Sequence, residues 1–215
     1  MRFLVLTDIH GRDKVAAWAN RLAVENGAEA ILILGDITHF GPASWAGEFL
    51  PKLVRPVYAI PGNCDPPELV CQEIERHGTL LHKRRVSIDK NTYIGLGGSN
   101  PTIFETPYEM EEEDIMSALR PLMVPDAILV LHAPAKGIND TISTGLHIGS
   151  DSVLELVTEF HPKVVLSGHI HEARGLVEKD GTLFLNPGAA KDGFAALIDI
   201  GTEARAELLD KVEDQ

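Results

Sequence analysis

The stretch ILILGD at residues 31–36 decides the fold, because a short apolar run is followed at once by glycine and aspartate. FLVLTDIH at residues 3–10 has the same design. Three further apolar runs also lead into a polar residue: VYAIPGN at 57–63, ILVLH at 128–132 and VVLSGHIH at 164–171. Runs of this length are typical of buried strands. Their recurrence predicts a largely parallel sheet whose strand ends carry polar side chains.

The segments between and around these runs have the apolar spacing of helices, which we expect over residues 12–26, 43–53, 67–77, 109–120 and 151–160. Strands that alternate with helices are typical of α/β proteins. Elsewhere the pattern becomes antiparallel. Asp180-Gly181 between two apolar runs predicts a hairpin, two further runs follow it, and a second hairpin is expected around residues 86–96. The sheet is therefore mixed, or there are two sheets. Without repeats or linkers, residues 1–215 are predicted to form one domain.

Composition excludes several classes of protein. The chain has 215 residues and 44% hydrophobic residues, too many for a disordered chain, and no apolar run long enough to span a membrane. A net charge of −13 argues against binding nucleic acid, short oligonucleotides excepted, although bound metal would offset local acidity. Two cysteines cannot form a disulfide framework, and the N-terminus lacks a secretory signal. We therefore expect a cytoplasmic protein that binds no membrane.

Five predicted strands each deliver a metal-competent side chain at the carboxyl end, where ligands bind in α/β sheets. These side chains are Asp8, His10, Asp36, Asn63, His132, His169 and His171. Carboxylates with imidazoles suit manganese, iron, nickel or zinc. Seven ligands are too many for one ion but suit two ions about 3.5–4 Å apart, an arrangement that hydrolyses phosphate esters. Glycine precedes Asp36, Asn63 and His169, which permits sharp turns there.

In their order along the chain, these residues resemble the motifs of the calcineurin-like metallophosphoesterases, especially the small bacterial and archaeal predicted phosphoesterases. The matching blocks are Asp8-Ile9-His10, Gly35-Asp36, Gly62-Asn63-Cys64-Asp65, His132 and Gly168-His169-Ile170-His171. The resemblance implies a four-layer α/β/β/α sandwich of two mixed sheets.

It also implies how the ligands divide between the ions. Asp8, His10 and His171 would hold one ion, Asn63, His132 and His169 the other, and Asp36 would bridge the two as the catalytic ligand. A hydroxide shared by the metals would attack phosphorus in line with the leaving oxygen. The expected function is hydrolysis of phosphodiesters or small phosphorylated compounds.

One position departs from the family pattern. The commonest third block has histidine after asparagine, and this residue contacts phosphate and helps to protonate the leaving group, whereas here the position is Cys64. A thiol is a weak substitute. The general acid is therefore open, with His39 and His147 as candidates, and esters with good leaving groups are expected to be preferred. Substrate contacts are expected at Asn63, Cys64, His39 and His147. Asp65 either pairs with a substrate-side group or caps the helix that follows it.

A function from another class also fits this fold. The superfamily includes a scaffold that uses the same fold to bind partners, so a non-catalytic binding module is the alternative to an enzyme. The ligands discriminate between them, because a scaffold has no reason to retain all seven metal-competent side chains, and this chain has them.

Overall fold

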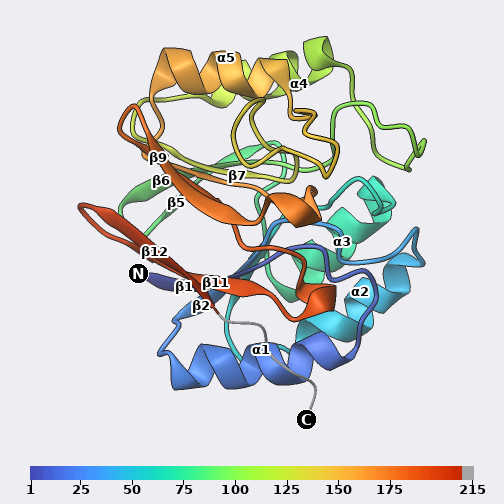
Figure 1. The fold of residues 1–215 in the computed structure, drawn as a ribbon. Helices are drawn as coiled ribbons and strands as arrows, with labels where there is room; N and C mark the ends of the chain where they lie inside the picture. Colours follow the sequence, from blue (N-terminus) through green and yellow to red (C-terminus); the bar gives the residue numbers. More distant parts are fainter. Residues whose placement is uncertain (210–215) are drawn as a thin grey trace.

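Two six-stranded mixed sheets face each other in the computed structural model, which describes residues 1–209 (Figure 1). The first sheet has the order β12-β11-β1-β2-β3-β4. β1, β2, β3 and β4 pair in parallel, and β11 and β12 pair antiparallel at one side. Its strands are β1 (Arg2–Leu6), β2 (Ala30–Ile33), β3 (Val57–Ala59), β4 (Thr79–Leu80), β11 (Ala195–Ile200) and β12 (Ala204–Leu209).

The second sheet has the order β5-β6-β7-β8-β10-β9. β6, β7, β8 and β10 are parallel, and a hairpin closes each side. Its strands are β5 (Arg84–Ile88), β6 (Asn91–Leu96), β7 (Ile128–Leu131), β8 (Val164–Leu166), β9 (Gly175–Lys179) and β10 (Thr182–Asn186). Both predicted hairpins are present. Of the two arrangements that the sequence allowed, one mixed sheet or two sheets, the structure has two sheets.

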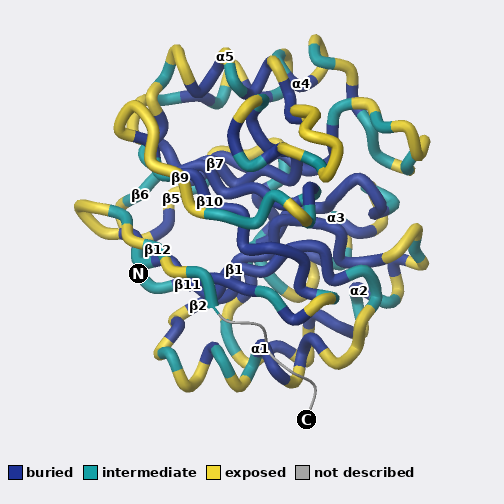
Figure 2. Tube along the Cα trace, viewed as in Figure 1, coloured by how far each residue is buried: buried dark blue, intermediate teal, exposed yellow. Residues whose placement is uncertain are grey.

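Helices cover the outer face of each sheet. The first sheet packs on α1 (Lys14–Glu25), α2 (Ala43–Phe49) and α3 (Pro67–His77), and the second on α4 (Glu112–Leu119) and α5 (Asp151–Phe160). In β1, Leu4 and Leu6 face the helices while Phe3 and Val5 face the other sheet. Figure 2 shows the buried chain concentrated between these layers. The result is the expected four-layer α/β/β/α sandwich.

Two predicted helices are followed directly by a 3₁₀ turn that contains a proline. The helix expected over 43–53 becomes α2 followed by a 3₁₀ turn, Leu50–Lys52, and the helix expected to reach residue 120 ends at Leu119 before a turn over Arg120–Leu122. Pro51 and Pro121 occupy the second position of these turns and lack the N–H that an α-helix needs. Among the described residues, no helix is long and apolar enough to cross a membrane.

Candidate metal centre

The carboxyl ends of strands from both sheets meet at one place. Asp8 N–H donates to Gly35 O over 3.1 Å, which joins the segments that follow β1 and β2. Gly168 N–H donates to His132 O over 2.9 Å, which joins those after β7 and β8. His132 also crosses between the sheets, because its Nδ1 lies 2.7 Å from Leu34 O. The facing sheets thus bring together residues that are far apart in the sequence.

Four of the predicted ligands have backbone conformations that are uncommon for residues other than glycine. Asp8, His10, Asp36 and His169 have φ angles of 54°, 47°, 50° and 65°. Aspartate and histidine enter this left-handed region more readily than most residues, and such conformations concentrate at functional sites, where the surrounding structure offsets their cost. At each of these four residues the backbone therefore departs from the extended conformation of a strand.

The glycines that precede the ligands are required for close packing. A Cβ on Gly62 would lie 2.0 Å from Asp36 Oδ1, and one on Gly168 would lie 1.9 Å from Thr7 Oγ1. Gly35 has a φ of 104°, and a Cβ there would approach His132 Nδ1 to 2.7 Å. Any larger residue at these positions would push the ligand side chains apart, as expected from their place in the sequence.

Metal-competent atoms gather in three overlapping groups. Within each group the atoms lie within 4.8 Å of one another: Asp8, His10 and His171; Asp8, Asp36 and His132; and His10, Asp36 and Cys64. Asp8, His10 and Asp36 each belong to two groups, so the three form one continuous cluster. Sharing of this kind is consistent with two neighbouring ions.

On one side of the cluster, Asp8, His10 and His171 face one another. His171 Nε2 lies 3.0 Å from Asp8 Oδ1, and His10 Nε2 lies 3.4 Å from His171 Nε2. His10 Nε2 is also 3.5 Å from Asp36 Oδ2. The two imidazoles and the carboxylates point their donor atoms at a shared point, as metal ligands do.

On the other side, the contacts of His132 fit a bound cation. Leu34 O can only accept, so His132 Nδ1 carries the proton, and a neutral ring then has a lone pair on Nε2. That Nε2 lies 2.8 Å from Asn63 Oδ1, also an acceptor, and 3.5 Å from Asp36 Oδ1. In the tautomer with the proton on Nδ1, the lone pairs of His132 Nε2 and Asn63 Oδ1 lie where a cation could bind both. The His169 ring lies 5.2 Å from that of His132.

Burial and neighbouring charges shift the pKa values of the site, and the shifts of Asp8, His10 and His169 favour metal binding. Burial lowers the pKa of His10 and of His169 to about 3, so both imidazoles are neutral at pH 7 and offer a lone pair. Burial raises the pKa of Asp36 to about 7, and a cation beside it would favour its ionised form. Burial also raises the pKa of Asp8, but the hydrogen bond with His171 and the nearby His132 and His10 together outweigh this effect and leave the pKa below its ordinary value.

Two supporting features were not identified from the sequence. Asp65 is fully buried and accepts hydrogen bonds from the N–H groups of Gly62, Ile37 and Thr38 and from the Thr38 hydroxyl. It ties the loop after β2 to the loop after β3. Asp65 was also a candidate for the N-cap of α3, but the residue at that position is Pro66. Its place in the G-N-C-D block was the available signal.

The second feature is a chain of hydrogen bonds behind Asn63. Asn63 Nδ2 donates to Thr106 Oγ1 over 2.9 Å, and Thr106 Oγ1 donates to Glu109 over 2.6 Å. The amide nitrogen is thereby engaged, and the oxygen faces His132. A threonine three residues before a glutamate is common at helix starts, so the sequence offered no specific signal for this role.

The three candidate substrate residues other than Asn63 differ in their distance from the cluster. Cys64 is buried in the cluster, and burial together with Asp36 raises the pKa of its thiol well above the ordinary value. His39 is exposed, and its Nδ1 lies 3.4 Å from that of His10. His147 is also exposed, and its Nδ1 lies 2.6 Å from the buried carboxylate of Asp140. Of these three, Cys64 and His39 contact the predicted ligands.

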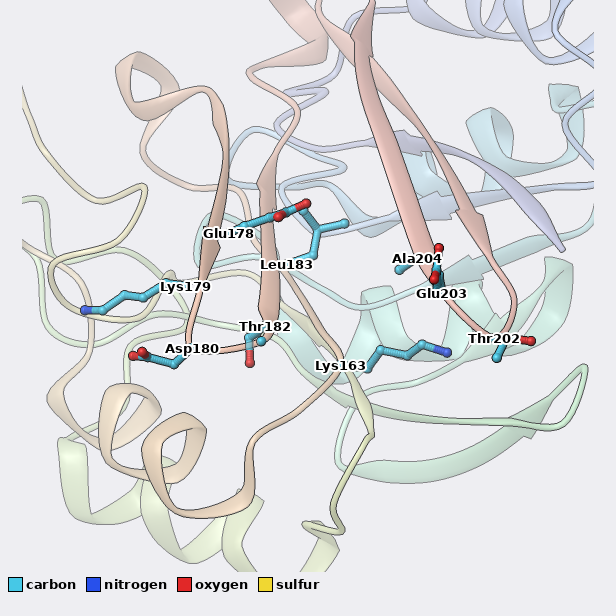
Figure 3. A pocket seen from close by; sticks show the side chains of 10 residues that line it. Lys163, Glu178, Lys179, Asp180, Thr182, Leu183, Thr202, Glu203 and Ala204 are labelled. Carbon is cyan, nitrogen blue, oxygen red and sulfur yellow. The ribbon is translucent and has the colours of Figure 1, made fainter.

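Two hollows of similar volume lie at opposite edges of the sheets. A pocket of about 520 Å³ adjoins the cluster and is lined in part by His169 and His171. The other, of about 490 Å³, lies among the turns of β9–β10 and β11–β12 beside Lys163 (Figure 3). Lys163 directly precedes β8, whereas His169 follows that strand, so the second hollow is remote from the predicted ligands.

Comparison of the sequence with known protein families identifies one that fits this site. The sequence profile of the calcineurin-like phosphoesterases matches residues 1–173, which contain every one of the predicted ligands. The chain belongs to this family. The match confirms the resemblance inferred from the motif order, and the candidate His and Asp clusters are consistent with a family of metal-binding phosphoesterases.

Individual relatives give the same result for the fold. An uncharacterized protein of Methanocaldococcus jannaschii is 31% identical over 87% of this chain and 88% of its own length. The structure of TT1561 from Thermus thermophilus has a TM-score of 0.74 at 19% identity, covering 96% of this chain and 98% of that one. A dimetal phosphatase from Danio rerio has a TM-score of 0.65 at 11% identity, covering 100% and 98%. At these identities the two structures establish the calcineurin-like fold alone.

Proposed function

We propose that this calcineurin-like protein is a dinuclear-metal-dependent phosphoesterase that hydrolyses phosphodiesters or small phosphorylated compounds. The observation that carries the proposal is the continuous cluster in which Asp8, His10 and Asp36 are each shared between two groups of donor atoms. Family membership supports the reaction class. The dimetal phosphatase from Danio rerio shares the fold, which supports the same interpretation.

The residues divide between two ions in this proposal. Asp8, His10 and His171 would hold one ion, Asn63, His132 and His169 would hold the other, and Asp36 would be shared by both. When bound, two divalent ions supply an activated water and neutralise the charge that develops on the phosphoryl group. The protein holds the ligands in place: His132 is oriented by Leu34 O, and Asn63 by Thr106. Manganese, iron, nickel and zinc all suit this set of ligands.

The proton for the leaving group needs a donor other than the usual family residue. Cys64 occupies the position where the family commonly has histidine, and its buried thiol is a poor acid. His39 contacts the predicted ligand His10, whereas the imidazole of His147 pairs with the carboxylate of Asp140. We therefore assign the acid to His39 and expect a preference for esters with good leaving groups, which need little protonation.

The proposal extends to the setting of the protein. Both cysteines are free thiols, which suits a reducing cytoplasm. A net charge of −13 opposes long nucleic acids, whose binding needs a basic surface, but permits short oligonucleotides and small phosphoesters.

The decisive experiment replaces the shared carboxylate. Asp36→Asn keeps the size of the side chain but removes its charge, and we expect hydrolysis to fall by at least about 10³-fold, with less metal in the purified protein by elemental analysis. Asp126→Asn, at an exposed turn where φ is 58°, is the matched control and should change neither. Full activity in Asp36→Asn would contradict the assignment.

A substrate screen separates an enzyme from a binding module. Chromogenic monoesters and diesters are incubated with manganese, nickel, zinc or magnesium, with a chelator as the negative control. We expect turnover that depends on an added transition metal. No turnover with any of these metals would favour the alternative, a non-catalytic scaffold on the same fold.

A further inference from the structure

The pocket beside the candidate metal centre is lined by polar and apolar side chains. His169 and His171 are among the polar ones. We use the name apolar wall for the apolar side chains that two loops contribute. The apolar wall comes from two loops that are distant in the sequence, and its aliphatic and aromatic side chains are Ile103, Phe104, Ile142 and Ile148. The volume of about 520 Å³ lies within the range of small-molecule sites.

Two of these side chains are unusually exposed. Ile103 is 91% exposed and Phe104 is 73% exposed, although both are large and apolar. Glu109 holds their loop by accepting hydrogen bonds from the backbone and hydroxyl groups of Thr102 and Thr106. The loop therefore does not fold inward to bury its own apolar tip. Exposed apolar groups that are fixed in this way mark a binding surface.

Hydrogen bonds also connect the two loops to each other and to the site. Asn100 Nδ2 donates to Ile148 O over 3.1 Å, and Ser143 N–H donates to Glu172 over 2.9 Å. Glu172 directly follows His171, and Thr106 is the partner of Asn63. The apolar wall is therefore held at a constant position relative to two of the predicted ligands.

The charge of the pocket narrows the class of ligand. Among the residues that line it, histidines apart, Glu172 is the only one with an ionisable side chain, and there is no lysine or arginine. A substituent with a second phosphate would meet an acidic group and no cation. An uncharged aryl or alkyl group would instead remove the apolar side chains from water.

We infer that this pocket holds an uncharged, apolar substituent of the phosphoester while the phosphoryl group lies at the metal cluster. The inference rests on the proposed function and extends it, because it names the substrate class: esters with an aryl or long alkyl group in preference to methyl esters and to esters with additional phosphates. Ile103 and Phe104 are then determinants of specificity.

Binding without hydrolysis tests the pocket by itself. Calorimetry compares phenylphosphonate with methylphosphonate on the manganese-loaded protein. We expect phenylphosphonate to bind about 10-fold more tightly, and the double variant Ile103→Ala/Phe104→Ala to lose most of that difference. Leu69→Ala, on α3 and 55% exposed, is the control and should retain it. Equal affinities in the unmodified protein, an unchanged preference in the double variant, or no binding of either phosphonate would overturn the inference.

Hydrolysis then separates the pocket from the proposed function. Diesters that share a 4-nitrophenyl leaving group and differ only in the second substituent, methyl or phenyl, keep the requirement for an acid constant. We expect kcat/KM to be about 10-fold higher for the phenyl diester, a ratio that the double variant reduces. No hydrolysis together with a retained phenylphosphonate preference would reject the enzyme and leave the pocket. Hydrolysis with equal kcat/KM for both diesters would reject the pocket and leave the enzyme.

Discussion

Asn63 donates its amide N–H to the hydroxyl of Thr106 over 2.9 Å, and this bond turns the amide oxygen toward His132. Thr106 lies 43 residues further along the chain, in the loop that also carries Ile103 and Phe104 of the pocket. We call this loop, residues 102–109, the substrate loop. A single hydroxyl therefore couples the orientation of a predicted metal ligand to the position of the substrate loop.

Removal of that hydroxyl is expected to weaken metal binding. Thr106→Val preserves the shape of the side chain but leaves Asn63 free to rotate. We expect a roughly 10- to 100-fold loss of affinity for the ion assigned to Asn63, the usual cost of removing a partner of a metal ligand. Chelator competition measures the loss. Thr158→Val, on the exposed side of α5, removes a hydroxyl bonded to Leu154 O and should leave metal affinity unchanged. Equal affinities for all three proteins would show that Thr106 has no such role.

Asp65 is expected to dominate the stability of the site loops. Asp65→Ala leaves the buried N–H groups of Gly62, Ile37 and Thr38 without their acceptor, which we expect to lower the free energy of unfolding by about 3–5 kcal/mol. Urea denaturation measures the change. Asp13→Ala is the control: Asp13 makes no capping bond and pairs with Lys52 on the surface, so its loss should cost under about 1 kcal/mol. Similar costs for both variants would contradict the role of Asp65 as a central acceptor.

Gly62→Ala tests the close approach of the loops. The added Cβ would lie 2.0 Å from Asp36 Oδ1, so either the loop or the Asp36 side chain must move. We expect metal content to fall severalfold and the melting temperature to drop by at least about 5 °C. Gly201→Ala places a Cβ whose nearest neighbour is 3.7 Å away and should leave both quantities nearly unchanged. Normal metal binding by Gly62→Ala would mean that the tight packing is unimportant.

The stability of the substrate loop should depend on pH through Glu109. Burial raises the pKa of Glu109, but its bonds with Thr102 and Thr106 outweigh this effect and lower the pKa to about 2. Because the folded pKa lies below that of the unfolded chain, the stabilisation is complete above about pH 4.5 and is lost as the pH falls toward about 2. Glu109→Gln should therefore melt a few degrees below the unmodified protein at pH 7 and at the same temperature near pH 2.

Melting curves at a series of pH values test this directly. A difference between Glu109→Gln and the unmodified protein that stayed constant from pH 7 to pH 2 would contradict the assigned pKa. Glu105→Gln, in the same loop at an exposed position, is the control and should show no pH-dependent difference.

Local sequence pattern predicted the alternation of strands and helices and the positions of the ligands, whereas the four-layer arrangement was implied by the family resemblance. The apolar run of β1 fits a strand buried on both faces, and the structure shows what covers them: helices on one face and the second sheet on the other. Asp8, Asp36 and His169 closely follow apolar runs, so they could be identified from the chain alone. The assignment of ions to ligands and the single domain over 1–215 stay predictions, and residues 210–215 lie outside the described chain.

Only the tertiary structure shows which groups form hydrogen bonds with those ligands. His132 is oriented by Leu34 O, 98 residues away in the sequence, and Asn63 by Thr106. Asp65, which resembles a helix cap in the sequence, is instead a buried acceptor between two loops. The physical reason is that strand and helix patterns depend on neighbours along the chain. The hydrogen bonds that aim a side chain depend on groups that meet only after both sheets have packed.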